Sequence, residues 1–174
     1  KEIGSSDKTG TKIMFKPDAE IFQDTEFHFD TLSSRLRELS FLNKGIKIIL
    51  EDKRTDKKQE FRYEGGIVSF IEYIDKGKNP LHKAIHFEKE KDNIRLEIAM
   101  QYNDSFQENI FSFANNINTI EGGTHLSGFK TALTRTLNNY AEKARIKEAK
   151  LSSEDVREGL SAVISAKIPQ PQFE

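Results

Sequence analysis

The segment "GGTH" is the first place in the chain where residue types and spacing suggest chemistry. Gly122, Gly123 and Thr124 stand directly before a strongly periodic stretch, and the free backbone N–H groups of such a helix start favour anions. The spacing differs from that of a P-loop or a dinucleotide-binding fingerprint. Thr124 is also a good N-cap, and the glycines allow positive φ in a tight turn. We expect a structural corner here, with a phosphate cradle as the alternative.

A second polar group is the turn "NDSFQEN", which gathers carboxylates and amides at Asn103, Asp104, Gln107, Glu108 and Asn109. Carboxylates so placed can transfer protons, but polar residues also fill ordinary turns between strands. No metal-ligand spacing joins the four histidines, which are His28, His82, His86 and His125. The chain has no cysteine, and no serine lies in a nucleophile elbow. The residues therefore indicate no self-contained active site.

Basic residues lie along or just after the periodic stretch: Lys130, Arg135, Lys143, Arg145, Lys147 and Lys150. Such a run usually marks a solvated helix face, and the alternative is the lining of a channel for DNA. Lys and Arg total 27 against 28 Asp and Glu, so the whole chain has no basic field that indicates nucleic-acid binding. Any contact with DNA must be a local patch.

The elements that position these groups form an α+β unit. A helix is predicted from the apolar stripe of Leu126, Phe129, Leu133, Leu137 and Tyr140. Residues 85–102 predict a hairpin that turns at Asp92-Asn93, with one face buried and the other wet. Residues 108–117 and 161–169 predict two more strands, and "LSSEDVREGL" predicts a short helix capped by Ser152 or Ser153. With an amphipathic helix at 67–74, we expect about four strands and two helices that cover one sheet face.

The first third of the chain has its own pattern. A short strand is expected at 13–15, closed by Pro17, and a helix is expected from the leucines Leu32, Leu36, Leu39 and Leu42. Residues 46–63 predict a hairpin with a charged loop. Gly65 and Gly66 then break the pattern, and we place a boundary there.

Length and composition indicate the general class of protein. A chain of 174 residues can bury a real core without disulfides, and the absence of cysteine fits a reducing cytoplasm. No apolar run approaches the roughly 18 residues of a membrane helix. The chain begins with Lys1, so we expect a cytoplasmic piece of a longer protein.

Several stretches together resemble the B subunit of bacterial DNA gyrase. They are "RLRELSFLNKGIKIILEDKR", "YEGGIVSFIEYI", "QYNDSFQENIFSFANNINTIEGGTHLSGFKTALTRTLNNY" and "REGLSAVISAKIPQPQFE". The resemblance runs nearly end to end and in the family's order. Topoisomerase IV, through its ParE subunit, shares the layout and is an alternative, as is a non-enzymatic interaction module of the same fold.

The resemblance implies a division at Gly65. Residues 1–64 would be the C-terminal portion of an ATP-binding domain of the gyrase, Hsp90, histidine kinase and MutL type, an α/β sandwich. Residues 65–174 would be the transducer domain, a mixed sheet with a left-handed βαβ crossover. Gly122, Gly123 and Thr124 would then launch the long transducer helix.

The resemblance also implies site residues and cofactors. Thr11, in "TGT", matches a threonine of the family's adenine pocket, and Lys130 matches a position that is usually an arginine facing the DNA cavity. ATP and Mg²⁺ would act in the parent protein. The family's catalytic glutamate and glycine-rich lid would precede Lys1, and its Gln-Thr-Lys loop would follow Glu174. We therefore expect that this chain alone has no catalytic residue and is inactive.

The partners implied are the A subunit of DNA gyrase, double-stranded DNA and a second copy of the B subunit on ATP binding. Aminocoumarin-type inhibitors would bind the parent protein, and no membrane is involved. The expected activity of the parent is ATP-driven negative supercoiling by a type II DNA topoisomerase.

Overall fold

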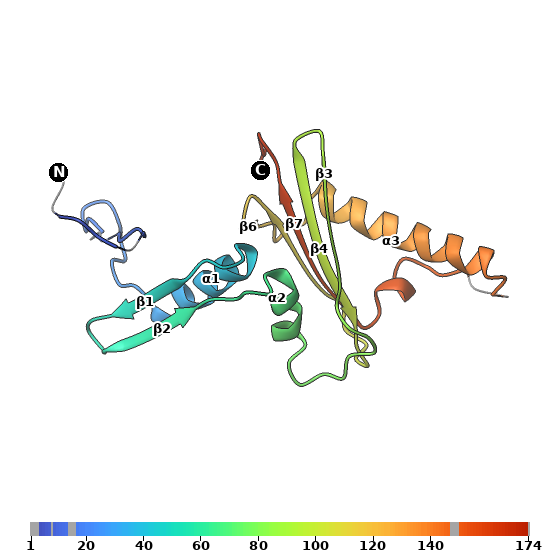
Figure 1. Ribbon diagram of the computed structural model, residues 1–174, viewed down its shortest axis with the longest axis horizontal. Helices are drawn as coiled ribbons and strands as arrows, with labels where there is room; N and C mark the ends of the chain where they lie inside the picture. The colour runs from blue at the N-terminus through green and yellow to red at the C-terminus, as the bar shows by residue number, and fades with distance from the viewer. Residues whose placement is uncertain (1–3, 8, 14–16, 147–149, 174) are drawn as a thin grey trace.

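A computed structural model describes residues 4–7, 9–13, 17–146 and 150–173. The elements in chain order are α1 (Phe29–Leu42), β1 (Ile48–Asp52), β2 (Lys57–Phe61), α2 (Ile67–Ile74), β3 (Ile85–Lys91), β4 (Ile94–Tyr102), β5 (Asn109–Ala114), β6 (Ile117–Asn118), α3 (Thr124–Lys143), the 3₁₀ helix η1 (Asp155–Arg157) and β7 (Leu160–Lys167). Figure 1 shows α1 with the β1–β2 hairpin at one end of the molecule and α3 at the other.

The main sheet has five strands in the order β3-β4-β7-β5-β6. Strand β7 is central: it is antiparallel to β4 and parallel to β5. The sequence predicts about four strands, and the fifth is β6, which has only two residues. It pairs with β5 through a tight turn in which Asn115 and Asn116 have φ of 48° and 68°. Asparagine tolerates this left-handed conformation better than most residues.

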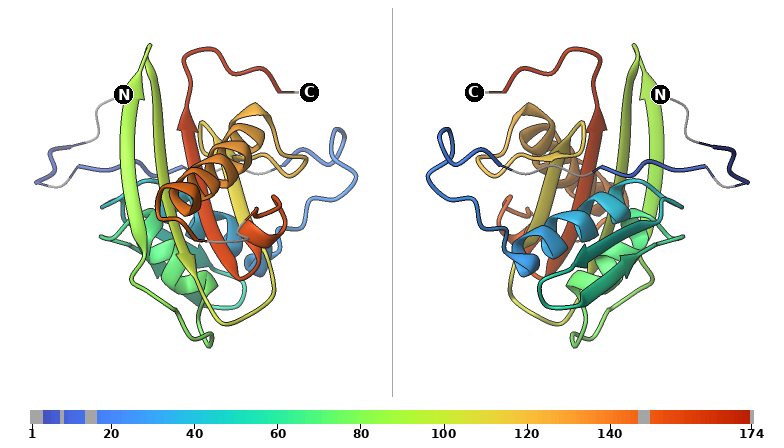
Figure 2. Two further views of the ribbon diagram at one scale, coloured as in Figure 1. Left: turned by 90° about the vertical axis from the view of Figure 1, so that its right-hand side faces the viewer. Right: turned by 90° about the vertical axis from the view of Figure 1, so that its left-hand side faces the viewer.

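The connection from β5 through α3 to β7 is a left-handed crossover. The left panel of Figure 2 views the sheet from the α3 side, with β5 and β7 running upward and β7 to the left of β5. Nearly all parallel crossovers are right-handed, because that hand matches the twist of the strands. Here α3 lies in front of the sheet and the chain passes leftward from β5 to β7, so the crossover is left-handed. The left-handed crossover that the resemblance implies is confirmed.

Both faces of the sheet are covered, by different helices. Ile98 of β4 packs in a cluster with Phe129 of α3, whereas the next residue, Ala99, packs in a cluster with α2. The two panels of Figure 2 show α3 on one side of the sheet and α1 with α2 on the other. The prediction that both helices cover one face is wrong. Successive residues of β4 still alternate between the two faces of the sheet, but the face expected to be exposed to water is also covered.

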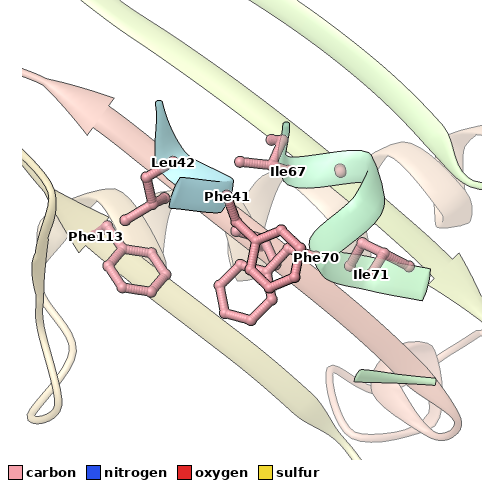
Figure 3. Packing of buried hydrophobic residues seen from close by; sticks show 8 residues of the cluster. Phe41, Leu42, Ile67, Phe70, Ile71 and Phe113 are labelled. Atoms are coloured by element: carbon pink, nitrogen blue, oxygen red, sulfur yellow. The ribbon is translucent and has the colours of Figure 1, made fainter. Parts of the chain in front are cut away.

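The core on the α2 side extends across residue 65. Its buried members are Phe41, Leu42, Ile67, Phe70, Ile71, Ala99, Phe113 and Val163. Figure 3 shows the end of α1 inserted beside α2, with the rings of Phe41 and Phe70 against each other. Burial of each such large apolar side chain contributes about 1.5–3 kcal/mol to folding. The last turn of α1 is therefore part of the packing that holds the main sheet.

The first third of the chain differs from its sequence pattern in two ways. Of the predicted leucine stripe on α1, only Leu42 is buried, and Ser33 and Ser40 are buried on the helix instead. Ser33 Oγ donates a hydrogen bond of 2.5 Å to Gln59 Oε1, so α1 meets the hairpin through a polar contact. The strand expected at 13–15 lies largely outside the described residues, and residues 9–13 are not in a strand.

Candidate functional site

The start of α3 is built from two glycines with positive φ. Gly122 has φ of 92° and Gly123 has φ of 147°, and a Cβ on Gly123 would lie 2.9 Å from the ring of His125. Gly123 is the N-cap and Thr124 is the first helical residue, so the prediction that Thr124 caps the helix is wrong. Glycine suits this cap because any other residue would be strained at this φ and its Cβ would meet the ring of His125.

His125 ties this corner to the sheet. Its Nε2 lies 3.2 Å from Thr119 Oγ1, and Thr119 Oγ1 donates to the carbonyl oxygen of Ser112 in β5 at 3.0 Å. Burial lowers the pKa of His125, which favours the neutral ring. The polar groups of the corner thus bind one another, an arrangement that supports the structural role expected for Gly122, Gly123 and Thr124.

Lys130 lies on α3 in a three-residue ion-pair network. Its Nζ is 2.7 Å from Glu108 Oε1, and Arg157 Nε is 2.7 Å from Glu108 Oε2. Glu108 directly precedes β5 and Arg157 ends η1, so one carboxylate joins three elements. Burial opposes the ionisation of Glu108, but the hydrogen bonds from Lys130 and Arg157 outweigh it and lower its pKa.

Further contacts fasten residues 151–157 along α3. Arg157 Nη1 donates to the carbonyl oxygen of Ser153 at 2.6 Å. The side chain of Asn138 binds the backbone of Leu151 twice, at 3.0 and 2.9 Å. Ser152 and Asp155 cap each other, with bonds of 2.7 and 3.1 Å between backbone N–H and side-chain oxygen. The N-cap residue of η1 is Glu154, so the prediction that Ser152 or Ser153 caps the helix is wrong, and the helix is only three residues of 3₁₀.

The other basic residues of the α3 region are unpaired where they are described. Arg135, Lys143, Arg145 and Lys150 are exposed, and no ion pair joins them to residues in the described ranges. Lys147 lies outside those ranges. The apolar stripe ends sooner than its sequence predicts, because Tyr140 is 66% exposed. Within the described residues, Lys130 is thus the paired cation of α3, whereas Arg135 and Lys143 on the same helix are unpaired.

Thr11, the predicted adenine contact, lies exposed and makes no hydrogen bond to a described residue. The hollow beside the β1–β2 hairpin has other walls: Pro17, Thr25, Phe27, Phe29, Leu32 and residues 50–54. Thr11 is thus not among the residues that line this hollow. Within the described ranges, no group of three His, Asp or Glu side chains can hold a metal ion. None of the described helices combines the length and the apolar character needed to cross a membrane.

The polar turn at 103–109 is structural in part. Asn103 is buried and donates to Asp75 Oδ1 at 3.2 Å, and Ser161 Oγ donates to the same oxygen at 2.5 Å. Asp104 Oδ2 accepts a hydrogen bond of 2.7 Å from Asn79. These contacts join the end of α2 to β4 and β7. Of the turn's carboxylates, Glu108 is the one that reaches the basic face.

Solved structures share this fold. The 43K ATPase domain of Thermus thermophilus gyrase B, in complex with an aminocoumarin, has a TM-score of 0.78 and 36% identity over 92% of this chain and 45% of that chain. The B subunit of DNA gyrase from Myxococcus xanthus has a TM-score of 0.78 and 26% identity over 88% of this chain and 43% of that chain. The fold of this chain thus belongs to the class of gyrase-type ATPase-region folds.

The sequence comparisons define the family. The family model for DNA gyrase B matches residues 66–174, and the chain belongs to the DNA gyrase B family. The B subunit of DNA gyrase from Clostridium acetobutylicum is 60% identical over 178 aligned residues, which cover 99% of this chain and 28% of that protein. The chain thus spans less than a third of the length of this relative.

Two parts of the site escape prediction from the sequence. The sequence indicates Arg157 only as part of a short helix, and Glu108 only as part of a turn. Glu108, Lys130 and Arg157 are far apart in sequence. No local spacing predicts that their side chains meet. The only sequence signal is chemical: one acid in the turn, and basic residues in α3 and η1.

Proposed function

We propose that this chain is a mechanical link in the ATPase region of a type II DNA topoisomerase. In the parent protein it would pass ATP-driven closure of two B subunits to DNA strand passage and negative supercoiling. The observation that carries the proposal is the shared core of α1, α2 and the main sheet, together with membership of the gyrase B family. A link must be stiff, and close packing makes it so.

The division into residues 1–64 and 65–174 remains our proposal, with the first part belonging to the ATP-binding domain. Polar contacts support a firm joint between the parts. Arg35 Nη2 donates to the carbonyl oxygen of Asn116 at 2.6 Å, and Arg37 Nη1 donates to Tyr73 Oη at 2.9 Å. Motion of the first part would therefore carry the sheet with it. A ligand drives such motion only if it binds one arrangement better than the other.

We propose that ATP and Mg²⁺ act in the parent protein and that this chain alone does not hydrolyse ATP. The exposed position of Thr11 supports this separation, because no described group surrounds it as an adenine pocket would. Contact of Thr11 with adenine, if the family pattern holds, would need walls from other parts of the parent.

We also propose the partners of the parent protein: the A subunit of DNA gyrase, double-stranded DNA and a second B subunit, all in the cytoplasm. The exposed cations Arg135, Lys143, Arg145 and Lys150 support a face toward DNA. Lys130 lies on the same helix as Arg135 and Lys143 and would belong to the same region. The aminocoumarin in the Thermus thermophilus complex supports binding of this inhibitor class by the parent.

The test uses the full-length parent protein with the A subunit of DNA gyrase on relaxed plasmid, with and without ATP. ATP-dependent negative supercoiling is the expected result. Relaxation or decatenation without supercoiling would identify a topoisomerase IV instead. No topological change in any condition would refute the proposed function.

A further inference from the structure

Glu108 is held between two cations from different elements. Each carboxylate oxygen takes one of them at 2.7 Å: Lys130 Nζ from α3 and Arg157 Nε from η1. The three side chains carry a formal charge of +1 together. About a third of the Lys130 and Glu108 side chains is exposed, and 14% of Arg157. The network is therefore a surface one that a ligand can reach.

We propose that Lys130 and Arg157 form a binding pair for a DNA backbone phosphate, and that Glu108 is a built-in competitor for this pair. The identity of the ligand rests on the proposed function. A phosphodiester, like a carboxylate, presents two oxygens that share one negative charge, and guanidinium and ammonium groups bind both kinds of anion. The two cations are thus already arranged around an oxyanion. DNA would replace Glu108 rather than bind beside it.

Arg157 has a second contact that does not involve Glu108, and the turn of α3 that carries Lys130 is joined to residues 151–157. Arg157 Nη1 keeps its bond to the carbonyl oxygen of Ser153, and the backbone carbonyl of Lys130 accepts a hydrogen bond of 2.9 Å from Thr134 Oγ1. Thr134 Oγ1 also reaches Ser153 Oγ at 3.3 Å, so α3 stays joined to residues 151–157. Rotation of the Glu108 side chain would free the pair without unfolding an element.

Competition of this kind sets a threshold for binding. A single phosphate gains little, because it must displace a carboxylate of equal charge that is already in place. Duplex DNA brings further phosphates that can reach the unpaired cations elsewhere in the α3 region, and the summed contacts can exceed the loss of the Glu108 pairs. The site would therefore prefer a polyanion to a free phosphate ion.

The experiment measures binding of a fluorescently labelled DNA duplex to this chain by anisotropy over a range of NaCl concentrations. Glu108→Gln should raise the affinity about tenfold at about 50 mM NaCl, and the dependence on salt should steepen by about one phosphate contact. Adding Arg157→Gln should cancel the gain. Circular dichroism checks that each variant is folded.

Glu142→Gln is the matched control, because it removes the same charge from an exposed position on α3 where no described ion pair involves Glu142. An equal gain in Glu142→Gln, or a gain that survives Arg157→Gln, would overturn the proposal. If Glu108→Gln is unfolded, Glu108→Asp keeps the charge but cannot span both cations. It should then bind DNA more tightly than the wild type, and an unchanged affinity would count against the proposal.

Inorganic phosphate distinguishes the ligand class. At the phosphate concentration of the duplex it should not displace DNA from Glu108→Gln, and displacement would overturn the assignment to a DNA backbone. The binding assay needs no ATP turnover. Supercoiling by the full-length parent can therefore fail while this result holds, and the reverse is also possible.

Discussion

The rings of Phe41 and Phe70 stack with their centroids 4.7 Å apart and their planes 7° apart. Phe41 lies in the last turn of α1 and Phe70 lies in α2, on opposite sides of the predicted boundary at Gly65. Tyr63 also stacks on Phe41, with ring centroids 3.8 Å apart. Two segments that the sequence assigns to different domains thus share an aromatic stack, and several measurable properties follow from it.

Replacing Phe70 by Ala should lower the free energy of unfolding by about 3–5 kcal/mol, because it leaves a cavity in a packed core. Phe70 is 4% exposed and contacts the rings of Phe41 and Phe111. Urea denaturation measures the change. Phe106→Ala is the matched control, since Phe106 is 84% exposed. It should change stability by less than about 0.5 kcal/mol. Equal losses in the two variants would contradict the core described above.

Gly159→Ala should destabilise the protein by at least about 2 kcal/mol, through strain and close contact together. Gly159 has φ of 70°, and a Cβ there would lie 2.6 Å from the carbonyl oxygen of Asn103 and 2.7 Å from that of Ser105. Gly128→Ala makes the same change within α3, where no described atom outside the helix backbone lies within 4 Å of the new Cβ. That control should stabilise by about 0.5–1 kcal/mol, as Ala is the better helix former. Thermal denaturation of both variants is the measurement.

Stability should fall as the pH is lowered past the ordinary pKa of histidine, in part because of His125. Burial lowers the pKa of its ring in the folded state, so the unfolded state binds the proton first. The contribution is complete above about pH 6.5 and is lost as the pH falls toward the lowered value. In His125→Asn, unfolding free energies measured between about pH 7 and pH 5 should show a shallower slope. Identical slopes would show that His125 does not titrate in this way.

Hydrogen exchange should separate the two proposed domains. Amides of the β1–β2 hairpin should exchange faster than those of residues 94–113, because the hairpin is a two-stranded sheet and residues 94–113 run through the main one. Amides of Phe41 and Leu42 should be as slow as the sheet, although they precede residue 65, since both residues lie in its core. Equal protection of the hairpin and residues 94–113 would contradict a boundary at Gly65.

Most elements are predictable because their signals are local. The hairpin turn at Asp92-Asn93 follows from its two residues, which have φ of 52° and 62° and suit a type I′ turn. The alternation along β4 and the apolar face of α2 are likewise periodic patterns. Periodicity does not predict which element packs against each face of a strand or helix. Burial of both Ile98 and Ala99, on opposite faces of β4, needs a helix on each side, and that depends on the hand of a crossover.

The candidate site is less predictable than the fold. Lys130 and the glycine corner follow from resemblance and spacing, whereas Glu108 and Arg157 are joined to Lys130 only by tertiary structure. The helix predicted from the leucines of α1 is confirmed, but Leu32, Leu36 and Leu39 are outside the buried core for a related reason. Leu32 packs at the rim of a hollow beside the hairpin, so a pattern of apolar spacing predicts a face but not what covers it.

The order of strands constrains how the protein is made. Strand β7 is the last strand of the described chain, yet it lies between β4 and β5, and no pairing between those two strands replaces it. On the ribosome, the β3–β4 hairpin and the β5–β6 hairpin must wait with open edges until residues 160–167 emerge and insert between them. The nascent chain therefore depends on this late strand for a complete sheet, and truncation or stalling before that point leaves two unpaired hairpins exposed to other chains.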